Sequence, residues 1–475
     1  MTKSQRTALA VLSAAMLMTI LDGSIVTVAM PAIQEDLGFS PAGLSWTVNA
    51  YLIAFGGLLL LAGRLGDLIG RKTMFVTGNI IFTAASVLAG VATTPAVLVA
   101  ARFLQGVGSA IAASVVLGIL VTIFTEPRQR ATAIGIFSFT GAAGASIGQV
   151  LGGVLTDALN WHWIFLINVP IGALTVLAAI KVLPNDRGLG WSAGADVLGA
   201  ALVTAGLMLG IYTVVEVERY GWVSPHTLGL GALAAALLAA FVLRQATATN
   251  PLLPLRIFRS RTVSGANVVQ MLTLAAMFAF QIIVALYLQK VLGYNALQTG
   301  LAMLPAAFAI GGVSLFASAR LITRFGERTV LIAGLALLLA GMSWLTRLPV
   351  DAGYIVDLLP VMVAIAGGGL VLPALTALGM SGADADDAGL ASGLFNTTQQ
   401  VGMAIGVAVL STLAAARTGT ELAAGASNAE ALTSGYRLAF TVAAGLLVAA
   451  LVVSATVLRT QNRTEVALGD PVPAL

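Results

Sequence analysis

The chain has 475 residues, of which 58% are apolar and only 9% are charged. Soluble domains carry about 25% charged residues, so most of this protein's surface must face lipid rather than water. The absence of cysteine excludes disulfides and cysteine-ligated metals. Two histidines without an H-E-x-x-H pattern predict no metal site, and a net charge of +4 without a basic run predicts no nucleic-acid binding.

Fourteen apolar stretches are long enough to cross a membrane, since a spanning helix needs about 20 mostly apolar residues. In chain order they are 9–31, 46–63, 74–93, 97–121, 132–156, 163–183, 194–214, 226–243, 263–288, 298–319, 329–346, 355–379, 389–413 and 437–458. Backbone groups in lipid must bond within their own segment, so each stretch is predicted to be a helix. The first stretch is too long for a cleavable signal. We therefore expect an all-α integral membrane protein.

The basic residues predict which helix ends face the cytoplasm. With the N-terminus inside, eighteen of the 24 Lys and Arg residues fall in cytoplasmic segments and five in outer segments, with Arg102 left inside a helix. Membrane proteins carry such an excess on the cytoplasmic side, and a missed or invented helix would scramble it. The distribution favours an even number of helices and both termini in the cytoplasm, in the inner (plasma) membrane.

Two loops on the same predicted side are similar in sequence. Residues 63–73 (GRLGDLIGRKT) and 319–329 (ARLITRFGERT) share Arg, Leu, Gly and Thr at a constant offset of 256 positions. The loops lie eight helices apart, which fits two parallel six-helix halves separated by two extra helices, an arrangement found in transporters. We expect an N-terminal bundle over 1–190, a two-helix insert over 191–250 and a C-terminal bundle over 251–475.

The first of these loops resembles the loop 2–3 signature of the major facilitator superfamily. The matching residues are Gly63, Arg64, Asp67, Gly70, Arg71 and Lys72. The resemblance implies a conformational clamp that ties the two halves together inside and so stabilises the outward-facing state. A carboxylate at a helix end can be held by a helix N-terminus or by an arginine. The alternative is that the basic residues only follow the positive-inside distribution.

Asp22 is the clearest carboxylate well inside a predicted helix, and Arg102 lies inside the fourth helix. Charges within the hydrocarbon normally face the protein interior or a watery cavity. At 1.5 Å per residue, the depths of these two residues below the outer surface differ by only about 5 Å, so a pair is geometrically possible. We expect both to couple transport to protons. The alternatives are a permanent brace without proton traffic and, for Arg102, snorkelling to the outer surface.

The fifth helix carries a glycine-rich face that resembles the antiporter motif of exporters in the same superfamily. Its members are Gly144, Gly148, Gln149, Gly152 and Gly153. Small residues let helices pack closely and slide without interlocking side chains. The family pattern usually has Pro where Gln149 stands, so we expect this helix to lack the usual kink.

Three further segments resemble the fourteen-helix drug:proton antiporters of that superfamily. They are residues 21–31 (LDGSIVTVAMP), 163–172 (WIFLINVPIG) and 389–402 (GLASGLFNTTQQVG). The family often has Asn where Thr27 stands and usually Arg where His162 stands. The resemblance implies a major facilitator fold of two six-helix bundles plus two extra central helices, and multidrug efflux by alternating access. A proton gradient would be the energy source, without a cofactor.

Interior amides are the candidates for the substrate cavity, namely Asn49, Gln105, Gln270, Gln281, Asn396, Gln399 and Gln400. Some members of the resembling family that export divalent cations carry an additional acid in the C-terminal half. Here that half has no carboxylate deep in a predicted helix, so the resemblance implies neutral, monocationic or anionic apolar substrates. The expected partners are the lipid bilayer, a small-molecule substrate and protons, with the chain acting as a monomer.

Two other functions remain open at this point. The same motifs would serve a dedicated exporter of one metabolite, lipid or self-made antibiotic. A membrane enzyme or sensor is a different class, but the sequence has neither a clustered catalytic constellation nor a loop long enough for a soluble domain. We therefore expect a transporter and not an enzyme.

Overall fold

The computed structural model describes residues 1–41, 43–186, 188, 190, 196–249, 251–253, 255–381 and 388–458, and these residues form helices and no strand. The first elements are α1 (Lys3–Leu37), η1 (Gly43–Ser45), α2 (Trp46–Ile69), α3 (Arg71–Gly90), α4 (Pro95–Ile123), α5 (Pro127–Ala158), α6 (Trp163–Leu166), α7 (Asn168–Val182), α8 (Val197–Tyr220) and α9 (Pro225–Thr247). They continue with η3 (Leu255–Arg259), α10 (Arg261–Lys290), α11 (Ala296–Gly312), η4 (Val313–Ser318), α12 (Ala319–Phe325), α13 (Glu327–Leu345), η5 (Tyr354–Leu358), α14 (Leu359–Ala364), α15 (Gly367–Ser381), α16 (Ala388–Ala423) and α17 (Asn428–Thr456). The expected all-α class is confirmed.

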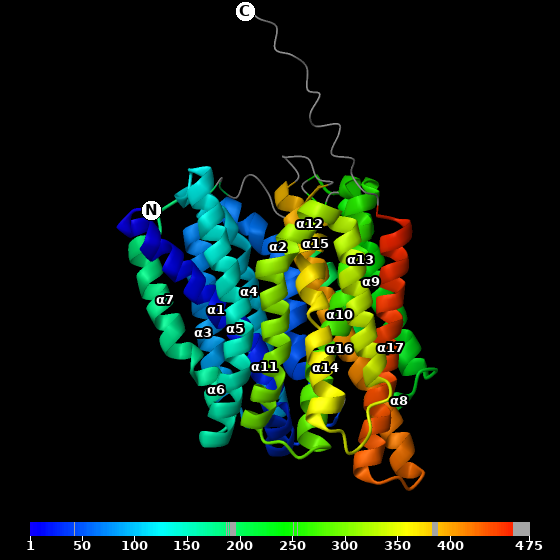
Figure 1. Cartoon of the computed structure of the whole chain (residues 1–475). Coiled ribbons are helices and arrows are strands. Elements are labelled where there is room, and N and C mark those ends of the chain that lie inside the picture. The colour runs from blue at the N-terminus through cyan, green and yellow to red at the C-terminus, as the bar shows by residue number, and fades with distance from the viewer. Residues whose placement is uncertain are drawn as a thin grey trace, which may run out of the picture.

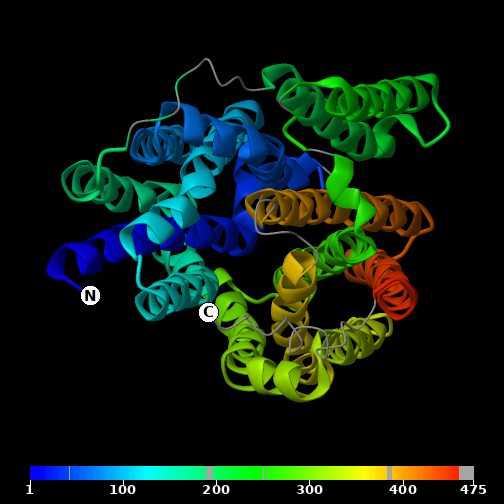
Figure 2. The same cartoon turned by 90° about the horizontal axis from the view of Figure 1, so that it is seen from above.

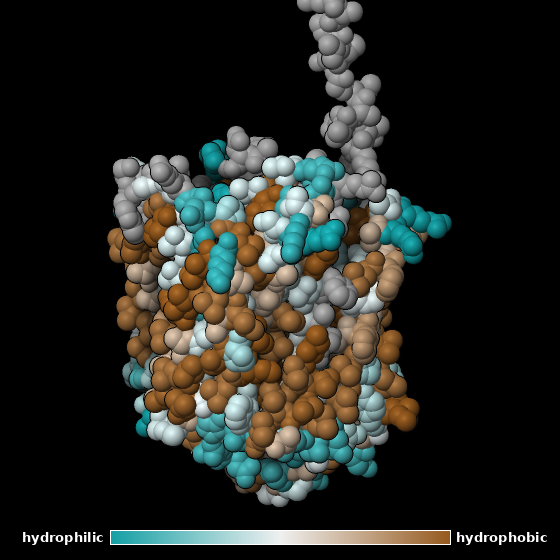
Figure 3. All heavy atoms as spheres, turned by 90° about the vertical axis from the view of Figure 1, so that its left-hand side faces the viewer, coloured by the Kyte–Doolittle hydropathy of each residue, from teal (hydrophilic) through white to brown (hydrophobic). Residues whose placement is uncertain are grey.

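The helices run side by side (Figure 1). Twelve helical stretches in the described part of the chain are long and apolar enough to cross a membrane. Helices α2, with 24 residues, and α5, with 32 residues, are not among these twelve stretches but have lengths in the same range. On the face seen in Figure 3, hydrophobic side chains fill the middle height and hydrophilic ones gather at both ends. The chain is a multi-pass membrane protein, while the count of fourteen spans stays a prediction.

Three of the expected helices are interrupted rather than continuous. The sixth is divided at Ile167 into α6 and α7, where Pro170 has no N–H to donate to the carbonyl of Leu166. The tenth contains the π-helical turn η4, and the twelfth consists of η5, α14 and α15. Such π segments need an extra residue in the helical turn and depend on tertiary contacts that hydropathy does not report.

The two halves of the chain form separate groups of helices when viewed along the bundle (Figure 2). Helices α8 and α9 lie to one side as a pair, and α8 packs against α2 and α16. The predicted boundaries at residues 190 and 250 border or include residues outside the described part of the chain, and they stay predictions.

Asp196, which caps α8, connects the two helices of the insert with each other. Its carboxylate accepts from the N–H of Gly199 at 2.9 Å, Gln245 Nε2 at 2.8 Å and Arg244 Nε at 3.1 Å. Burial raises the pKa of Asp196, but these hydrogen bonds and the Arg244 charge outweigh it and leave the pKa lowered. Gln245 also accepts from the N–H of Leu253, so this cluster joins the insert to the segment leading to α10.

The repeated loops adopt the same turn. Gly70 joins α2 to α3 with φ of 112°, and Gly326 joins α12 to α13 with φ of 81°. Both φ values lie where residues with a Cβ are strained, which explains glycine at these equivalent positions. The weak sequence repeat therefore corresponds to a repeated helix–turn–helix geometry.

The two halves share a buried apolar cluster at one end of the molecule. We name the end where α1 begins the upper end, as drawn in Figure 1, and the end where α1 finishes the lower end. At the lower end one buried apolar cluster contains residues of both halves, including Ile25 and Val26 with Ile282 and Val407. At the upper end, the N-terminal half has its own cluster around Phe75 and Phe124, without residues of the C-terminal half.

Hydrogen bonds between the halves lie at the same lower end. Asp157 at the end of α5 accepts from the backbone N–H groups of Ala296 at 3.3 Å and Leu297 at 2.9 Å, at the start of α11. Gln289 Nε2 donates to the carbonyl of Val28 at 2.9 Å. The structure is thus closed between the halves at the lower end.

Candidate functional site: a buried ion pair in the N-terminal half

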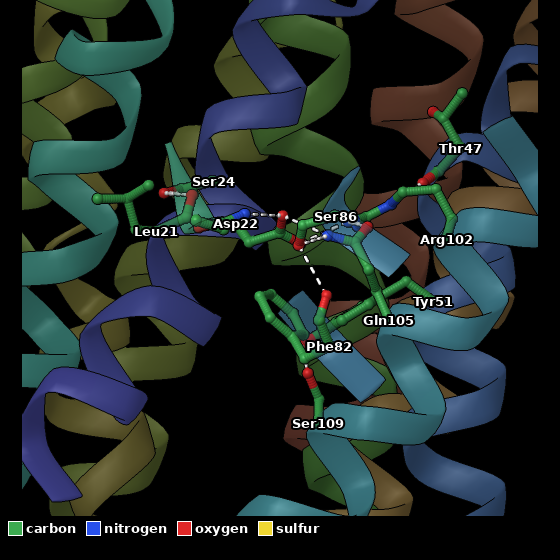
Figure 4. Close-up of polar contacts among 11 residues, drawn as sticks. Leu21, Asp22, Ser24, Thr47, Tyr51, Phe82, Ser86, Arg102, Gln105 and Ser109 are labelled. Carbon is green, nitrogen blue, oxygen red and sulfur yellow. Dashed lines mark hydrogen bonds and ion pairs between the residues drawn. The ribbon is translucent and has the colours of Figure 1, made fainter. Parts of the chain in front are cut away.

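Asp22 and Arg102 face each other inside the N-terminal half (Figure 4). One Arg102 guanidinium nitrogen is bonded to Asp22 Oδ2, and the side chains are 0% and 1% exposed. The sequence left this pair as a geometric possibility, and the structure brings the two residues together. Removing either charge from such a pair would leave the other one buried without compensation, which is strongly unfavourable.

Amide side chains complete the bonding of the carboxylate. Gln105 Nε2 donates to Asp22 Oδ1 at 3.0 Å, and Asn168 Nδ2 donates to the same oxygen at 2.9 Å. Gln105 also accepts from Arg102 through Oε1 at 2.9 Å and donates to Ser86 Oγ at 2.8 Å. The carboxylate therefore accepts from Arg102, Gln105 and Asn168, an arrangement that suits the ionised form.

Arg102 is held by α2 as well as by α1. Its Nε donates to the carbonyl of Thr47 at 2.7 Å, and its guanidinium carbon lies 4.6 Å from the centre of the Tyr51 ring. The Phe165 ring is 5.8 Å away on another side. Tyr51 in turn donates to Ser109 Oγ at 3.0 Å. The ion pair thus connects α1, α2 and α4 with the joint between α6 and α7, so its charge state affects several helices together.

The loop 2–3 residues make their described contacts within the N-terminal half. Arg71 donates to the carbonyl of Gly118 and to Thr122, both at 3.3 Å, and Lys72 Nζ donates to the carbonyl of Ile180 at 2.7 Å. Asp186 accepts from the backbone N–H groups of Arg71 at 2.6 Å and Lys72 at 3.1 Å.

The remaining loop residues give partial information about the expected clamp. Gly63 and the half-buried Arg64 lie in the last third of α2, and Gly70 forms the turn. The side chain of Asp67 lies outside the described residues. The clamp between halves stays a prediction.

The glycines of α5 face two different helices. A Cβ on Gly148 would overlap Ser24 Oγ and lie 2.9 Å from the carbonyl of Leu21, and one on Gly152 would lie 2.8 Å from the carbonyl of Ile25. Gly144 also packs on α1, whereas a Cβ on Gly153 would lie 2.6 Å from the carbonyl of Ala296 in the other half. Helix α5 is continuous through Gln149, which is buried.

The candidate cavity amides do not form a single group. Gln105 belongs to the ion-pair network, and Asn49 is buried in α2, where it donates to Ser45 Oγ at 3.4 Å. In the C-terminal half, Gln270 donates to the carbonyl of Phe395 at 2.9 Å. Gln400 is buried where a Cβ on Gly56 of α2 would touch it. The half-buried members are Gln281, Asn396 and Gln399.

Four residues of these sites were missed as functional candidates from the sequence. Asn168 and Ser86 complete the ion-pair network, Asp186 caps α3, and Asp157 caps α11 across the interface. Asn168 stands in the segment WIFLINVPIG, so its motif was a usable signal. The partners of the others lie far away in sequence and left no local signal. No group of three or more His, Asp or Glu suited to a metal ion occurs among the described residues.

Comparisons with known proteins agree with this architecture. Residues 12–407 match the family model described as Major Facilitator Superfamily. The puromycin resistance protein pur8 of Streptomyces alboniger is 36% identical over 98% of this chain and 94% of its own length. The cephamycin export protein CmcT of Amycolatopsis lactamdurans is 38% identical over 87% of this chain and 85% of its own.

A solved structure shares the fold at low sequence identity. The crystal structure of the POT family transporter PepTSo aligns with a TM-score of 0.69 and 16% identity, covering 96% of this chain and 98% of that one. The likeness extends over almost the whole of both chains.

Proposed function

This chain belongs to the major facilitator superfamily, and from that premise we propose that it is a proton-coupled antiporter that exports small, largely apolar antibiotics or toxic metabolites by alternating access. The observation that carries this proposal is the buried Asp22–Arg102 pair with its amide partners. Relatives named for resistance to puromycin and for cephamycin export support the exported class.

The proposed orientation has the upper end in the cytoplasm, because eighteen of the 24 basic residues fall in segments assigned to that side. It has both termini inside, in the plasma membrane, and fourteen spans when α2, α5 and the interrupted helices are each counted once. The shared apolar cluster and the Asp157 bonds then lie on the outer side. This arrangement supports an inward-facing state, in which an exporter takes up its substrate.

The proposed coupling uses the charge of Asp22. In the outward-facing state a proton from outside neutralises the carboxylate, which weakens its bond to Arg102 and favours substrate release. After return to the inward-facing state, Asp22 loses the proton to the cytoplasm and the pair forms again. A buried charge pair is suited to this task because breaking it has a large effect on the packing of the helices around it.

A dedicated exporter of one compound is the second candidate. The names of the two relatives each contain one antibiotic, puromycin or cephamycin, rather than a range of drugs. The same coupling site would serve both functions, so the breadth of accepted substrates distinguishes them.

The test is transport by the purified protein in proteoliposomes with an imposed pH gradient. The panel contains puromycin, a cephamycin and unrelated lipophilic cations, and both drug movement and internal pH are recorded. We expect drug movement against a counterflow of protons that an uncoupler abolishes and that protein-free vesicles lack. Transport that ignores the pH gradient would refute the coupling. Response to a single compound would favour the dedicated exporter.

A further inference from the structure

We propose that Asn168 is the positioning residue that stabilises Asp22 in both of its charge states, by turning its amide from donor to acceptor when Asp22 takes up a proton. This inference rests on the proposed function, because it assumes that Asp22 is protonated during transport. It is supported by the unequal use of hydrogen-bonding atoms around the carboxylate.

The side chains that bond the Asp22 carboxylate all act toward it as hydrogen-bond donors. Arg102 bonds Asp22 Oδ2, and Gln105 and Asn168 bond Oδ1. A protonated carboxyl group gains an O–H that needs an acceptor, and a guanidinium has none to offer. Burying a hydroxyl without a partner is unfavourable, so the site needs an acceptor close to Asp22.

Gln105 is not free to supply that acceptor. Its Oε1 accepts from Arg102 at 2.9 Å, and its Nε2 donates both to Asp22 and to Ser86. Turning this amide over would break all three bonds and would point its NH2 group at the guanidinium.

Asn168 has the opposite distribution of bonds. Its side chain is buried with 0% exposure. Among the described residues, its Nδ2 donates only to Asp22, and its Oδ1 is a buried oxygen without a hydrogen-bond partner. A half-turn of this amide exchanges the two atoms. The half-turn breaks the bond that Asn168 Nδ2 donates to the carboxylate. In its place, Asn168 Oδ1 accepts a bond from the O–H of protonated Asp22, and no other contact of Asn168 is broken.

Other titratable groups do not replace Asn168 in this role. Arg102 and Tyr51 are the charged or titratable side chains near Asp22 among the described contacts, and Tyr51 already donates to Ser109. Apart from Arg102 in α4, the helices packed against α1 carry their charges near their ends. These charges are Arg64 and Asp67 in α2, Arg128, Arg130 and Asp157 in α5, Lys181 in α7, and Arg261 and Lys290 in α10. Helices α6 and α11 carry none.

The location of Asn168 suits a movable group. It is the first residue of α7, directly after the interruption at Ile167. Its backbone therefore lies at a joint rather than in the middle of a continuous helix, and its change of partner acts at the point where α6 meets α7.

The test follows the amide by infrared difference spectroscopy on the full chain in lipid nanodiscs, with asparagine carrying 13C at its side-chain carbonyl. On acidification we expect the band of a protonated carboxyl group and, with the same midpoint, a shift of one labelled amide band. Both changes should disappear in Asp22→Asn. The amide change should disappear in Asn168→Leu and persist in Asn79→Leu, a matched loss of a buried amide that bonds only the carbonyl of Phe75.

The outcomes separate this inference from the proposed function. A carboxyl band that titrates without any change in the Asn168 amide overturns the role of Asn168 and leaves proton coupling intact. If no Asp22 carboxyl band forms, the proposed coupling and this inference fall together. Because the wild-type spectrum decides, poor folding of a variant does not block the test.

Transport gives the second readout. We expect Asn168→Leu to lower gradient-driven efflux at least about tenfold, since the protonated state loses its acceptor, whereas Asn79→Leu should stay within about twofold. Asn168→Ser keeps a hydroxyl that both donates and accepts, and it should retain more coupling than Asn168→Leu. Equal efflux by Asn168→Leu and Asn79→Leu would count against the proposal.

Discussion

The N-terminal and C-terminal halves bury polar groups of different kinds. In the N-terminal half an ion pair is held by Gln105, Asn168 and the carbonyl of Thr47, and both charges are compensated. In the described part of the C-terminal half the buried polar side chains are amides and hydroxyls, and no charged one is buried. Several of their oxygens lack a partner, among them Gln270 Oε1, Thr273 Oγ1 and Gln400 Oε1.

Two bundles of similar fold can therefore carry different chemistry. A compensated charge pair responds strongly to one proton, because neutralising one partner leaves the other uncompensated. Neutral amides with a spare acceptor respond little to pH but can bond a ligand. Under the proposed function, the N-terminal half senses the proton and the C-terminal half offers neutral groups to a substrate.

Asp22→Asn should have the largest effect. We expect gradient-driven efflux to fall to the level of empty vesicles, and folded yield to fall too, because an unpaired buried charge costs about 3–5 kcal/mol. Asp22→Asn combined with Arg102→Gln should recover yield but not coupling. The measurements are efflux in vesicles and the monodisperse fraction after purification. Normal pH-driven transport by Asp22→Asn would show that the ion pair of the N-terminal half does not sense the proton.

The matched change in the C-terminal half is Gln270→Leu. It removes one hydrogen bond to the carbonyl of Phe395, so we expect a loss of stability of only about 0.5–1.5 kcal/mol and coupling that survives. Substrate affinity is the quantity that should change. A loss of proton coupling here would show that the two halves share the task.

The second prediction concerns the two faces of α5. Gly148→Leu should lower folded yield, because its side chain would enter the backbone of α1 at Leu21 within one half, and overpacking costs about 1–3 kcal/mol. Gly153→Leu should fold but resist closure at the lower end, where it meets Ala296 of the other half. Single-cysteine labelling near α11 measures that closure, and the native chain has no cysteine to interfere.

Gln149→Pro is the control for the glycine interpretation. Exporters with the resembling motif carry Pro at this place, so we expect the variant to keep its efflux. Full activity of Gly148→Leu, or complete loss in Gln149→Pro, would contradict the assignment of close packing to the glycines.

The third prediction compares the two repeated turns. Gly70→Ala and Gly326→Ala both place a Cβ on a residue with positive φ, which costs about 1–3 kcal/mol. At Gly70 the new Cβ would also lie 2.9 Å from the carbonyl of Asp186, so Gly70→Ala should lower the thermal unfolding temperature more. Equal shifts would show that the contact with Asp186 contributes nothing.

The smallest effect is expected outside the membrane, at Asp196. The pKa of Asp196 is lowered from 3.8 in the folded protein. Ionised Asp196 therefore adds to the free energy of unfolding above pH 3.8, and this added stability is lost as pH falls through the folded pKa. The Arg244 partner is 43% exposed, which limits the pair to about 0.2–1 kcal/mol. The unfolding temperature of wild type should exceed that of Asp196→Asn near pH 6, and the gap should close below pH 3.8. If the difference between the two unfolding temperatures grew as pH fell, this prediction would be wrong.

Local sequence was sufficient for most of the helices, and it left one long-range contact as a possibility. Hydropathy located the apolar helices because each spans the same thickness of lipid. The similar depths of Asp22 and Arg102 made their pairing possible, but only the structure shows that the two side chains meet. The equivalent turns at Gly70 and Gly326 followed from a repeat of only a few residues.

The other contacts depended on three-dimensional packing. Asn168 lies 146 positions from Asp22, and Asp157 lies 140 positions from Leu297, so no periodic pattern connects them. Asp186 looked like an ordinary loop residue until the turn at Gly70 brought the start of α3 beside it. The π-helical turns η4 and η5 arise from tertiary contacts that a hydropathy profile averages out.

The apolar cluster shared by the halves at the lower end has a thermal consequence. If the halves separate there, side chains such as Ile25, Val26, Ile282 and Val407 become exposed to water. Exposure of apolar surface to water increases the heat capacity, and the opposing hydrophobic free energy weakens on cooling. Opening at this end should therefore become easier as temperature falls, and a plot of its equilibrium constant against inverse temperature should be curved rather than straight.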